Sequence, residues 1–361
     1  MDLTFFILPT TSAHYCLHAR PRYTTSAPSL LSTTELSALL GCTLAQCHRT
    51  RPWLVRALLP AVLMPPLFLT STDFLADTTA STRSLLTFLT LLSNTYTPQP
   101  RRRTIPSLYF SLVRPPAPVP APSTPRRPFS PSGTTLSILA HVLILDASLL
   151  VLKRMVSAPH VLVSRYLACP VTALVFYCPL QICFSLAQLA AYLNREDVGT
   201  WRPLFVRPWV STSISDFWGR RWHQLFRHAF TTLAYKPLAR KFRHGVLRRV
   251  MPVCGVFALS GVCHMYIMYT AFDDLSPSTF MFFMIHAAGS IFETFIESYF
   301  QNFIPRHPVF TVTGWCWFVS FFTTTGPLFL SPFLTLARSV NTPVSMVGWL
   351  LGLRPLMLCA S

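Results

Sequence analysis

The chain alternates between long apolar runs and short polar stretches, and this pattern predicts helices that cross a membrane. A helix needs about 20 apolar residues to span a hydrocarbon core of about 30 Å. The predicted spans are 55–72, 135–152, 161–193, 250–272, 279–300, 309–336 and 344–360. The shorter run 85–92 is typical of a re-entrant or interfacial segment. Depending on how 85–92 and 161–193 are counted, we expect seven to nine spans.

Prolines interrupt several of these runs, among them 55–72 and 161–193. The first contains Pro60, Pro65 and Pro66, which a membrane helix tolerates when neighbouring groups satisfy the freed carbonyls. The run 161–193 is broken at Pro170 and Pro179, and therefore predicts either one kinked span or two short ones.

A proline- and arginine-rich segment divides the chain. Residues 97–133 hold eleven prolines and six arginines, a density that prevents helix and favours extended, solvated chain. We interpret this segment as a cytosolic loop, and a linker without function of its own is the plain alternative. It separates an N-terminal region with the first membrane span, residues 1–96, from a membrane core, residues 134–361.

Composition excludes an ordinary soluble domain. Of the 361 residues, 51% are hydrophobic and only 12% are charged, whereas soluble domains carry about a quarter charged residues. A chain with so few charges cannot cover a surface that faces water. We therefore predict an all-α fold, a multi-pass transmembrane helical bundle whose first partner is the lipid bilayer.

The net charge of +18 has two ordinary interpretations. Basic proteins bind nucleic acid, and membrane proteins carry Lys and Arg in their cytosolic loops. The long apolar runs favour the second, so we expect no nucleic-acid partner. The dense basic stretch 194–249 is then cytosolic, where it also offers a binding surface for an anionic co-substrate. The ten cysteines are scattered without a CxxC pair, so we predict neither a metal site nor a disulfide framework.

A string of aromatic and charged residues, SDFWGRRWHQ, runs from Ser215 to Gln224. As a helix it would place Trp218 and Trp222 on one face, with Ser215 or Asp216 as the cap. An amphipathic helix at the membrane interface explains the tryptophans and arginines. It does not explain why Asp216, His223 and Gln224 stand beside them.

His264 lies near the middle of the apolar run 250–272. Ionisable groups are costly in lipid and usually serve a function, although a histidine also bonds a neighbouring helix in some membrane proteins. Ser260 lies one turn earlier on the same face, where it can orient the imidazole. His264 is therefore a candidate functional residue.

Four polar residues share one face of the next run: His286, Ser290, Glu293 and Glu297. Their spacings of four, three and four place them on one side of a helix, and that side is expected to face the bundle interior. A proton relay, a metal site and a supporting role all fit. We favour the supporting role, because no clean ligand set stands out.

Together, these residues resemble the wax-synthase-like branch of the membrane-bound O-acyltransferases. The resemblance rests on DFWGRRWHQ followed by a histidine behind Ser260-Gly261, and extends over residues 202–332. It implies that His264 is catalytic and that His223 is a second polar group of the reaction chamber. Members often carry Glu after the catalytic histidine, where this chain has Met265; Glu293 and Glu297 are the carboxylates available to compensate.

The implied reaction moves an acyl group from acyl-CoA to a hydroxyl of a hydrophobic acceptor. A neutral imidazole suits removal of the hydroxyl proton, and a second donor suits the oxyanion. We expect support from Ser260, Asp216, Trp222, Gln224, Glu293 and Glu297, and contacts to CoA phosphates from Arg220, Arg221 and Arg227. Simple topology control explains each single arginine equally well. No bound cofactor is expected, since acyl-CoA acts as co-substrate.

Fungal members of this branch acetylate secondary metabolites, especially terpenoids, and we favour acetyl-CoA and a terpenoid-type alcohol. Family members reside in the endoplasmic reticulum, which we expect here. The alternatives are a long-chain acyl-CoA alcohol acyltransferase that makes wax or sterol esters, a proton-coupled transporter, and a membrane protein without enzymatic activity. Buried His, Asp and Glu residues also serve transporters, but the chain shows no internal repeat.

Overall fold

The computed structural model describes residues 23–24, 40, 44, 57–70, 74–96, 129–156, 161–300 and 308–339. Within them the fold is helical, as predicted, apart from two-residue strands β1 (Tyr23–Thr24) and β2 (Leu69–Thr70). These strands pair in parallel, with Tyr23 opposite Leu69. The predicted loop 97–133 is outside the described residues up to 128, and the predicted span 344–360 is wholly outside them.

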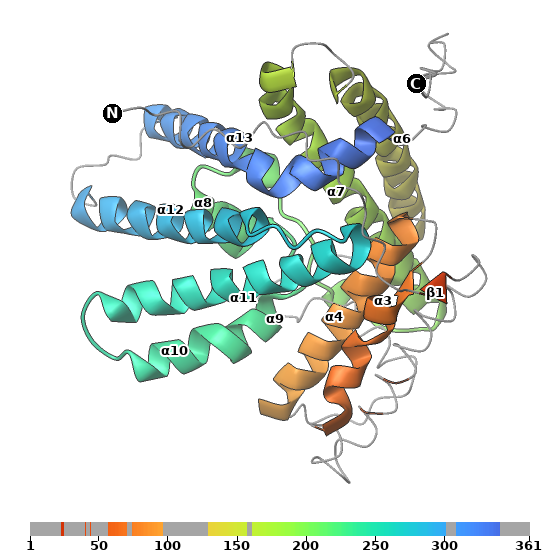
Figure 1. Ribbon diagram of the computed structural model, residues 1–361, viewed down its shortest axis with the longest axis horizontal. Helices are drawn as coiled ribbons and strands as arrows, with labels where there is room; N and C mark the ends of the chain where they lie inside the picture. Colours follow the sequence, from red (N-terminus) through yellow and green to blue (C-terminus); the bar gives the residue numbers. More distant parts are fainter. Residues whose placement is uncertain are drawn as a thin grey trace.

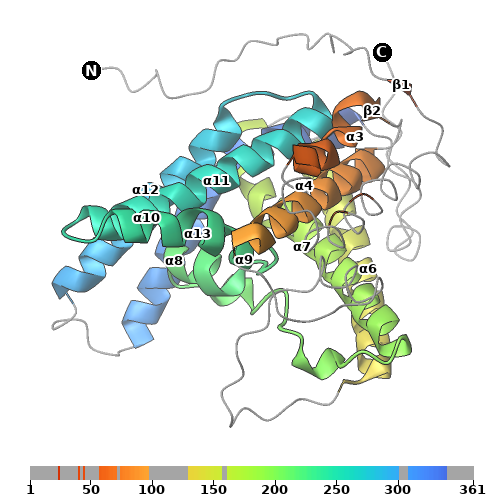
Figure 2. The same cartoon turned by 90° about the horizontal axis from the view of Figure 1, so that it is seen from below.

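The long helices form a layered bundle (Figure 1). Helices α11 (Leu247–Phe272) and α12 (Ser278–Phe300) lie side by side, and α13 (Pro308–Ser339) packs against α12. Helices α6 (Pro131–Val156) and α7 (Val161–Leu193) form a second pair, which α13 also contacts. The view from below shows α4 (Phe74–Tyr96) alongside α11 (Figure 2).

Four of the described helices are long and apolar enough to cross a membrane. They are Pro131–Val156, Tyr166–Leu193, Leu247–Phe272 and Ser278–Tyr299. Helix α6 exposes Leu136, Leu139 and Leu143 on its surface, as expected for a helix that faces lipid. The expected number of seven to nine spans therefore remains a prediction.

The N-terminal elements differ from the predicted first span. Instead of one helix over 55–72, the chain forms a 3₁₀ turn, η2 (Leu59–Leu63), then the short α3 (Pro65–Phe68) and β2. Prolines 60, 65 and 66 lack the N–H groups that a continuous helix needs. The run 85–92 belongs to the 23-residue α4. Tyr266 of α11 donates to the Leu63 carbonyl at 2.9 Å, which fastens this region to the bundle.

Helix α7 resolves the ambiguity of the run 161–193, because it is one 33-residue helix with Pro170 and Pro179 inside it. Helices α11, α12 and α13 match their predicted bounds within a few residues. Between α7 and α11 lie only short elements: η3 (Val198–Thr200), η4 (Pro208–Val210), α8 (Ile214–Asp216), η5 (Phe217–Arg221), α9 (Arg227–Phe230), η6 (Thr231–Tyr235) and α10 (Lys236–Lys241).

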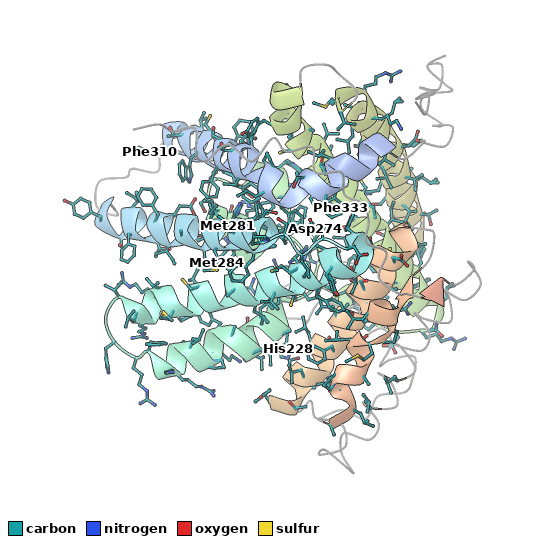
Figure 3. The ribbon with its side chains drawn as sticks, viewed as in Figure 1. His228, Asp274, Met281, Met284, Phe310 and Phe333 are labelled. Atoms are coloured by element: carbon teal, nitrogen blue, oxygen red, sulfur yellow. The ribbon has the colours of Figure 1, made fainter. Side chains whose placement is uncertain are left out.

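Aromatic side chains fill the space between α11, α12 and α13 (Figure 3). The buried centre contains Phe257 of α11 with Phe282, Phe283 and Ala287 of α12. The aromatic–charged string Ser215–Gln224 packs against this centre through Trp218. The fold therefore places that string beside the apolar helices that carry His264 and His286.

Candidate active site

The string begins with one helical turn and then tightens differently from the predicted helix. Ser213, rather than Ser215 or Asp216, is the N-cap, and its hydroxyl accepts from the Asp216 N–H at 2.9 Å. The turn α8 passes directly into a π-helical turn, η5, after which Trp222 is extended. Trp218 and Trp222 still meet, edge to face, at 6.4 Å. Isolated π turns often occur at functional sites.

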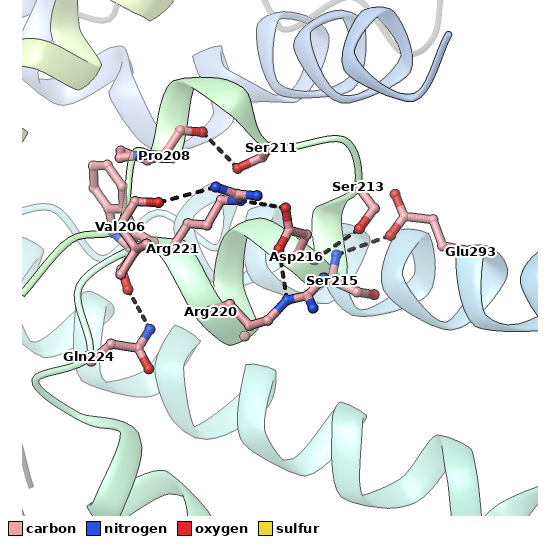
Figure 4. A network of polar contacts seen from close by, with 12 residues as sticks. Val206, Pro208, Ser211, Ser213, Ser215, Asp216, Arg220, Arg221, Gln224 and Glu293 are labelled. Carbon is pink, nitrogen blue, oxygen red and sulfur yellow. Dashed lines mark hydrogen bonds and ion pairs between the residues drawn. The ribbon is translucent and has the colours of Figure 1, made fainter. Parts of the chain in front are cut away.

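Glu293 of α12 fixes the start of this string (Figure 4). Its two carboxylate oxygens accept from the N–H groups of Ile214 at 2.8 Å and Ser215 at 3.0 Å. The indole of Trp317 on α13 donates to the same carboxylate at 2.9 Å. Gly289 permits the close approach, since a Cβ there would be 2.6 Å from the Ile214 side chain. Three elements therefore meet at one buried carboxylate.

Asp216 holds the other end of the turn. Its buried carboxylate accepts from the Nε of Arg220 at 2.8 Å and from the Nε of Arg221. Figure 4 shows the carboxylate between the two guanidinium groups. Arg221 is three-quarters covered, whereas the Arg220 side chain is 76% exposed. Of the two, only Arg220 has a side chain that is mostly exposed.

Gln224 and Arg227 hydrogen-bond to each other and to backbone carbonyls of the string. Arg227 donates to the Gln224 side-chain oxygen at 2.8 Å and to the Gly219 carbonyl. Gln224 in turn donates to the Trp222 carbonyl at 2.6 Å. Trp222 stacks on Phe217 with 5.0 Å between ring centroids. These predicted site residues thus brace the backbone of the string around His223.

His286 is completely buried and hydrogen-bonded on both ring nitrogens. The indole N–H of Trp218 can only donate, so His286 Nδ1 accepts at 2.9 Å. Nε2 of the neutral ring then carries the proton and donates to the Thr325 hydroxyl at 2.9 Å. The Thr325 hydroxyl in turn donates a hydrogen bond to the Phe321 carbonyl at 2.8 Å. This fixed relay orients the Trp218 indole.

His264 has a different bonding pattern. Its Nδ1 lies 2.8 Å from the Ser260 carbonyl, which only accepts, so Nδ1 carries the proton. The Ser260 hydroxyl is farther away, at 3.5 Å. Within the described part of the chain, no group hydrogen-bonds to Nε2. Phe283 and Phe329 lie against the ring, at 4.5 and 5.5 Å between centroids. The lone pair of Nε2 is therefore available in an aromatic surrounding.

His223 is near enough to His264 for a charge on the His264 ring to affect the pKa of His223. Burial lowers the pKa of His223 to about 3, and the charge that His264 would carry lowers it further, against a small opposite effect of a backbone hydrogen bond. His223 is therefore neutral at working pH. Its Nδ1 is buried without a hydrogen-bond partner among the described residues. An unpaired buried nitrogen is costly unless a ligand completes it.

The predicted polar face of α12 is buried at His286, Ser290 and Glu293. The prediction is wrong for Glu297, which is exposed because it lies in the last turns of the helix. Sequence reasoning missed Ser213, Trp317 and Thr325, and gave Trp218 only a place on a helix face. The polar Thr323-Thr324-Thr325 run inside the apolar 309–336 was the available signal for Thr325.

The fold and the site define a helical membrane protein in which aromatic rings contact the imidazoles of His223 and His264. Residues 201–285 match the model of the Membrane bound O-acyl transferase family. The match covers the string, His223 and His264. It begins where the predicted resemblance begins.

Several curated proteins are similar to part of the chain. A probable long-chain-alcohol O-fatty-acyltransferase 7 of Arabidopsis thaliana is 28% identical over 127 residues, which is 34% of this chain and 37% of that protein. The acetyltransferase nanB of Aspergillus nanangensis is 26% identical over 41% of this chain and 38% of its own length. The acetyltransferase aurG of Calcarisporium arbuscula is 26% identical over 46% of this chain and 43% of its own. The matched part thus spans under half of each relative's length.

Proposed function

We propose that this protein is an acyl-CoA-dependent O-acyltransferase that acylates a hydroxyl of a hydrophobic acceptor, with Nε2 of His264 as the general base. The proposal depends chiefly on the tautomer of His264. The Ser260 carbonyl holds the proton on Nδ1, which leaves Nε2 as the only ring atom with a lone pair. The family match and the acyltransferase names of similar proteins support this reaction class.

The proposed step is direct transfer without an acyl-enzyme. The acceptor oxygen attacks the thioester carbonyl while Nε2 of His264 takes its proton. The tetrahedral intermediate then expels the CoA thiolate, which recovers that proton as the free thiol. Nδ1 of His223, when it carries the proton of the neutral ring, is the buried donor available to the oxyanion.

We further propose acetyl-CoA as donor and a terpenoid-type alcohol as acceptor, at the endoplasmic reticulum membrane. The two fungal acetyltransferases align over more of this chain than the plant fatty-acyltransferase does. A long-chain donor is the alternative that the plant relative supports. The transporter alternative finds no support in the bonding of His286 and Glu293, whose ring nitrogens and carboxylate oxygens already have partners.

A microsomal assay with labelled acetyl-CoA and terpenoid, sterol and fatty alcohols tests this function. His264→Ala should lower transfer by at least about a hundredfold, because it removes the base. His141→Ala is the matched control: its Nδ1 also donates to the carbonyl four residues earlier, Ser137, at 2.6 Å, within an apolar helix. Transfer by His264→Ala at the wild-type rate, with both variants inserted, would overturn the assignment. Transfer only from longer acyl-CoAs would overturn the choice of acetyl.

A further inference from the structure

A pocket of about 590 Å³ opens at the start of α11, and neither His223 nor His264 lines it. The turn between α10 and α11 forms most of its wall, and Phe295 of α12 lines the remainder. Gly245 turns the chain with φ +69°, and a Cβ at that position would meet no atom within 4 Å. The charged side chains of the lining are Arg243, Arg248 and Arg249, with His244 beside them.

These three arginines have no acidic partner among the described residues. Arg243 uses its Nε on the Arg240 carbonyl at 3.2 Å, and Arg248 and Arg249 make no ion pair there. Arg220 and Arg221, in contrast, share Asp216. Like charges gathered around one cavity repel each other, and a bound anion removes that repulsion.

The helix itself adds a second reason for an anion. Val246 is the N-cap of α11 and supplies no side-chain hydrogen bond, and the first turn contains no acidic residue. Arg248 and Arg249 occupy that turn. A helix N-terminus carries partial positive charge and favours anions, so two cations there are opposite to the usual arrangement. An anion in the pocket would offset both the side-chain charges and the helix dipole.

We propose that this pocket binds a phosphate-bearing ligand, with Arg243, Arg248 and Arg249 as donors and Phe295 as an aromatic wall. A guanidinium group can donate two parallel hydrogen bonds to phosphate oxygens, and these bonds are stronger than those of neutral donors. Two sources carry this chemistry. One is the nucleotide end of the acyl donor, a source that rests on the proposed function. The other is the headgroup of an anionic lipid.

Position supports the nucleotide source. Arg249 and His264 stand fifteen residues apart on the same helix, about 22 Å at 1.5 Å per residue. A ligand with phosphates at one end and a thioester at the other has the elongated form that such a separation requires. Exposed Val246 and Leu247, at 59% and 52%, lie beside the pocket and suit a lipid surface instead. The experiment must therefore separate the two.

The test uses the full chain in nanodiscs and the double variant Arg248→Gln/Arg249→Gln. The matched control is Lys236→Gln/Arg240→Gln, which removes the same charge from exposed positions of α10 outside the pocket. Donors are acetyl-CoA and S-acetylpantetheine, which lacks the nucleotide. Calorimetry measures the binding of adenosine 3′,5′-bisphosphate. Cosedimentation measures how much of the protein binds to vesicles with and without anionic lipid.

If the nucleotide is the ligand, the double variant raises KM for acetyl-CoA and Kd for the bisphosphate about tenfold or more, since charge-assisted bonds are lost. The KM of the double variant for S-acetylpantetheine stays unchanged. The control variant keeps the wild-type KM and Kd values. If the lipid is the ligand, only the preference for anionic vesicles falls. No change in any of these readouts overturns the pocket. Nucleotide binding without transfer from either donor would refute the proposed function while leaving the pocket intact.

Discussion

His264 and His286, on the neighbouring helices α11 and α12, differ in what their hydrogen bonds leave free. His286 has a partner on each nitrogen, Trp218 on one side and Thr325 on the other, and so cannot take a proton without losing a bond. His264 has a partner on Nδ1 alone. Because a neutral imidazole offers one lone pair, His264 rather than His286 has the free nitrogen that the proposed base requires. His286 is instead a positioning residue for the Trp218 indole.

Replacing His286 tests that positioning role. We expect His286→Ala to lower kcat about tenfold with little change in KM, because the indole loses its acceptor and the ring contacts loosen. His286→Asn should recover much of kcat, since its side-chain oxygen can accept from the indole. Steady-state kinetics with each variant gives both constants. If Asn and Ala are equally impaired at equal thermal stability, the Trp218 bond is not the reason.

Sequence alone could identify His264 because an ionisable residue within an apolar run stands out. It could not assign the tautomer, which depends on a carbonyl, nor the partners of His286. Trp218 and Thr325 lie 68 and 39 residues away along the chain from His286. Only the packing of three helices brings such residues together. The roles of His264 and His223 therefore remain proposals, for which the geometry now names the ring atoms: Nε2 of His264 and Nδ1 of His223.

At the scale of elements, long apolar helices were predictable and short polar ones were not. The bounds of α11, α12 and α13 follow from hydropathy, since each must bury its backbone polar groups within lipid. The helix predicted over the string is replaced by α8 and a π turn. That geometry is set by Glu293, a residue 77 positions after Asp216, and local pattern contains no information about it.

The carboxylate of Glu293 provides a test of how the string is held. Glu293→Gln leaves one oxygen for three donors, so at least one buried N–H loses its acceptor at about 1–3 kcal/mol. Hydrogen exchange of residues 213–221 should accelerate and transfer activity should fall. Glu297→Gln, on the same helix but exposed, is the control and should change neither. Unaltered exchange in Glu293→Gln would show that the string is held by its other contacts.

At the scale of the whole molecule, the string Ser215–Gln224 brings polar side chains, His223 among them, into the interior of a membrane protein. Four helices qualify as spans, and the segment that carries His223 lies between them in sequence. The aromatic rings of Phe205, Trp222 and Phe226 surround that imidazole. Enclosure keeps His223 neutral, which suits an oxyanion donor but makes the fold sensitive to acid.

This sensitivity has a definite sign. Burial, with the nearby His264, lowers the pKa of His223 to about 3, whereas the unfolded side chain titrates near 6.5. Below pH 6.5 the unfolded state therefore binds the extra proton, and stability falls as pH drops toward 3. Between pH 6.5 and 5 the loss from this one group is about 2 kcal/mol. Thermal unfolding in detergent at pH 7 and pH 5 measures this loss of stability.

Variants assign the loss to His223. His223→Gln should lose less stability over this interval than the wild type, while the exposed-site control His244→Gln should follow the wild type. An equally steep loss in His223→Gln would assign the acid sensitivity to other groups and would contradict a buried neutral His223.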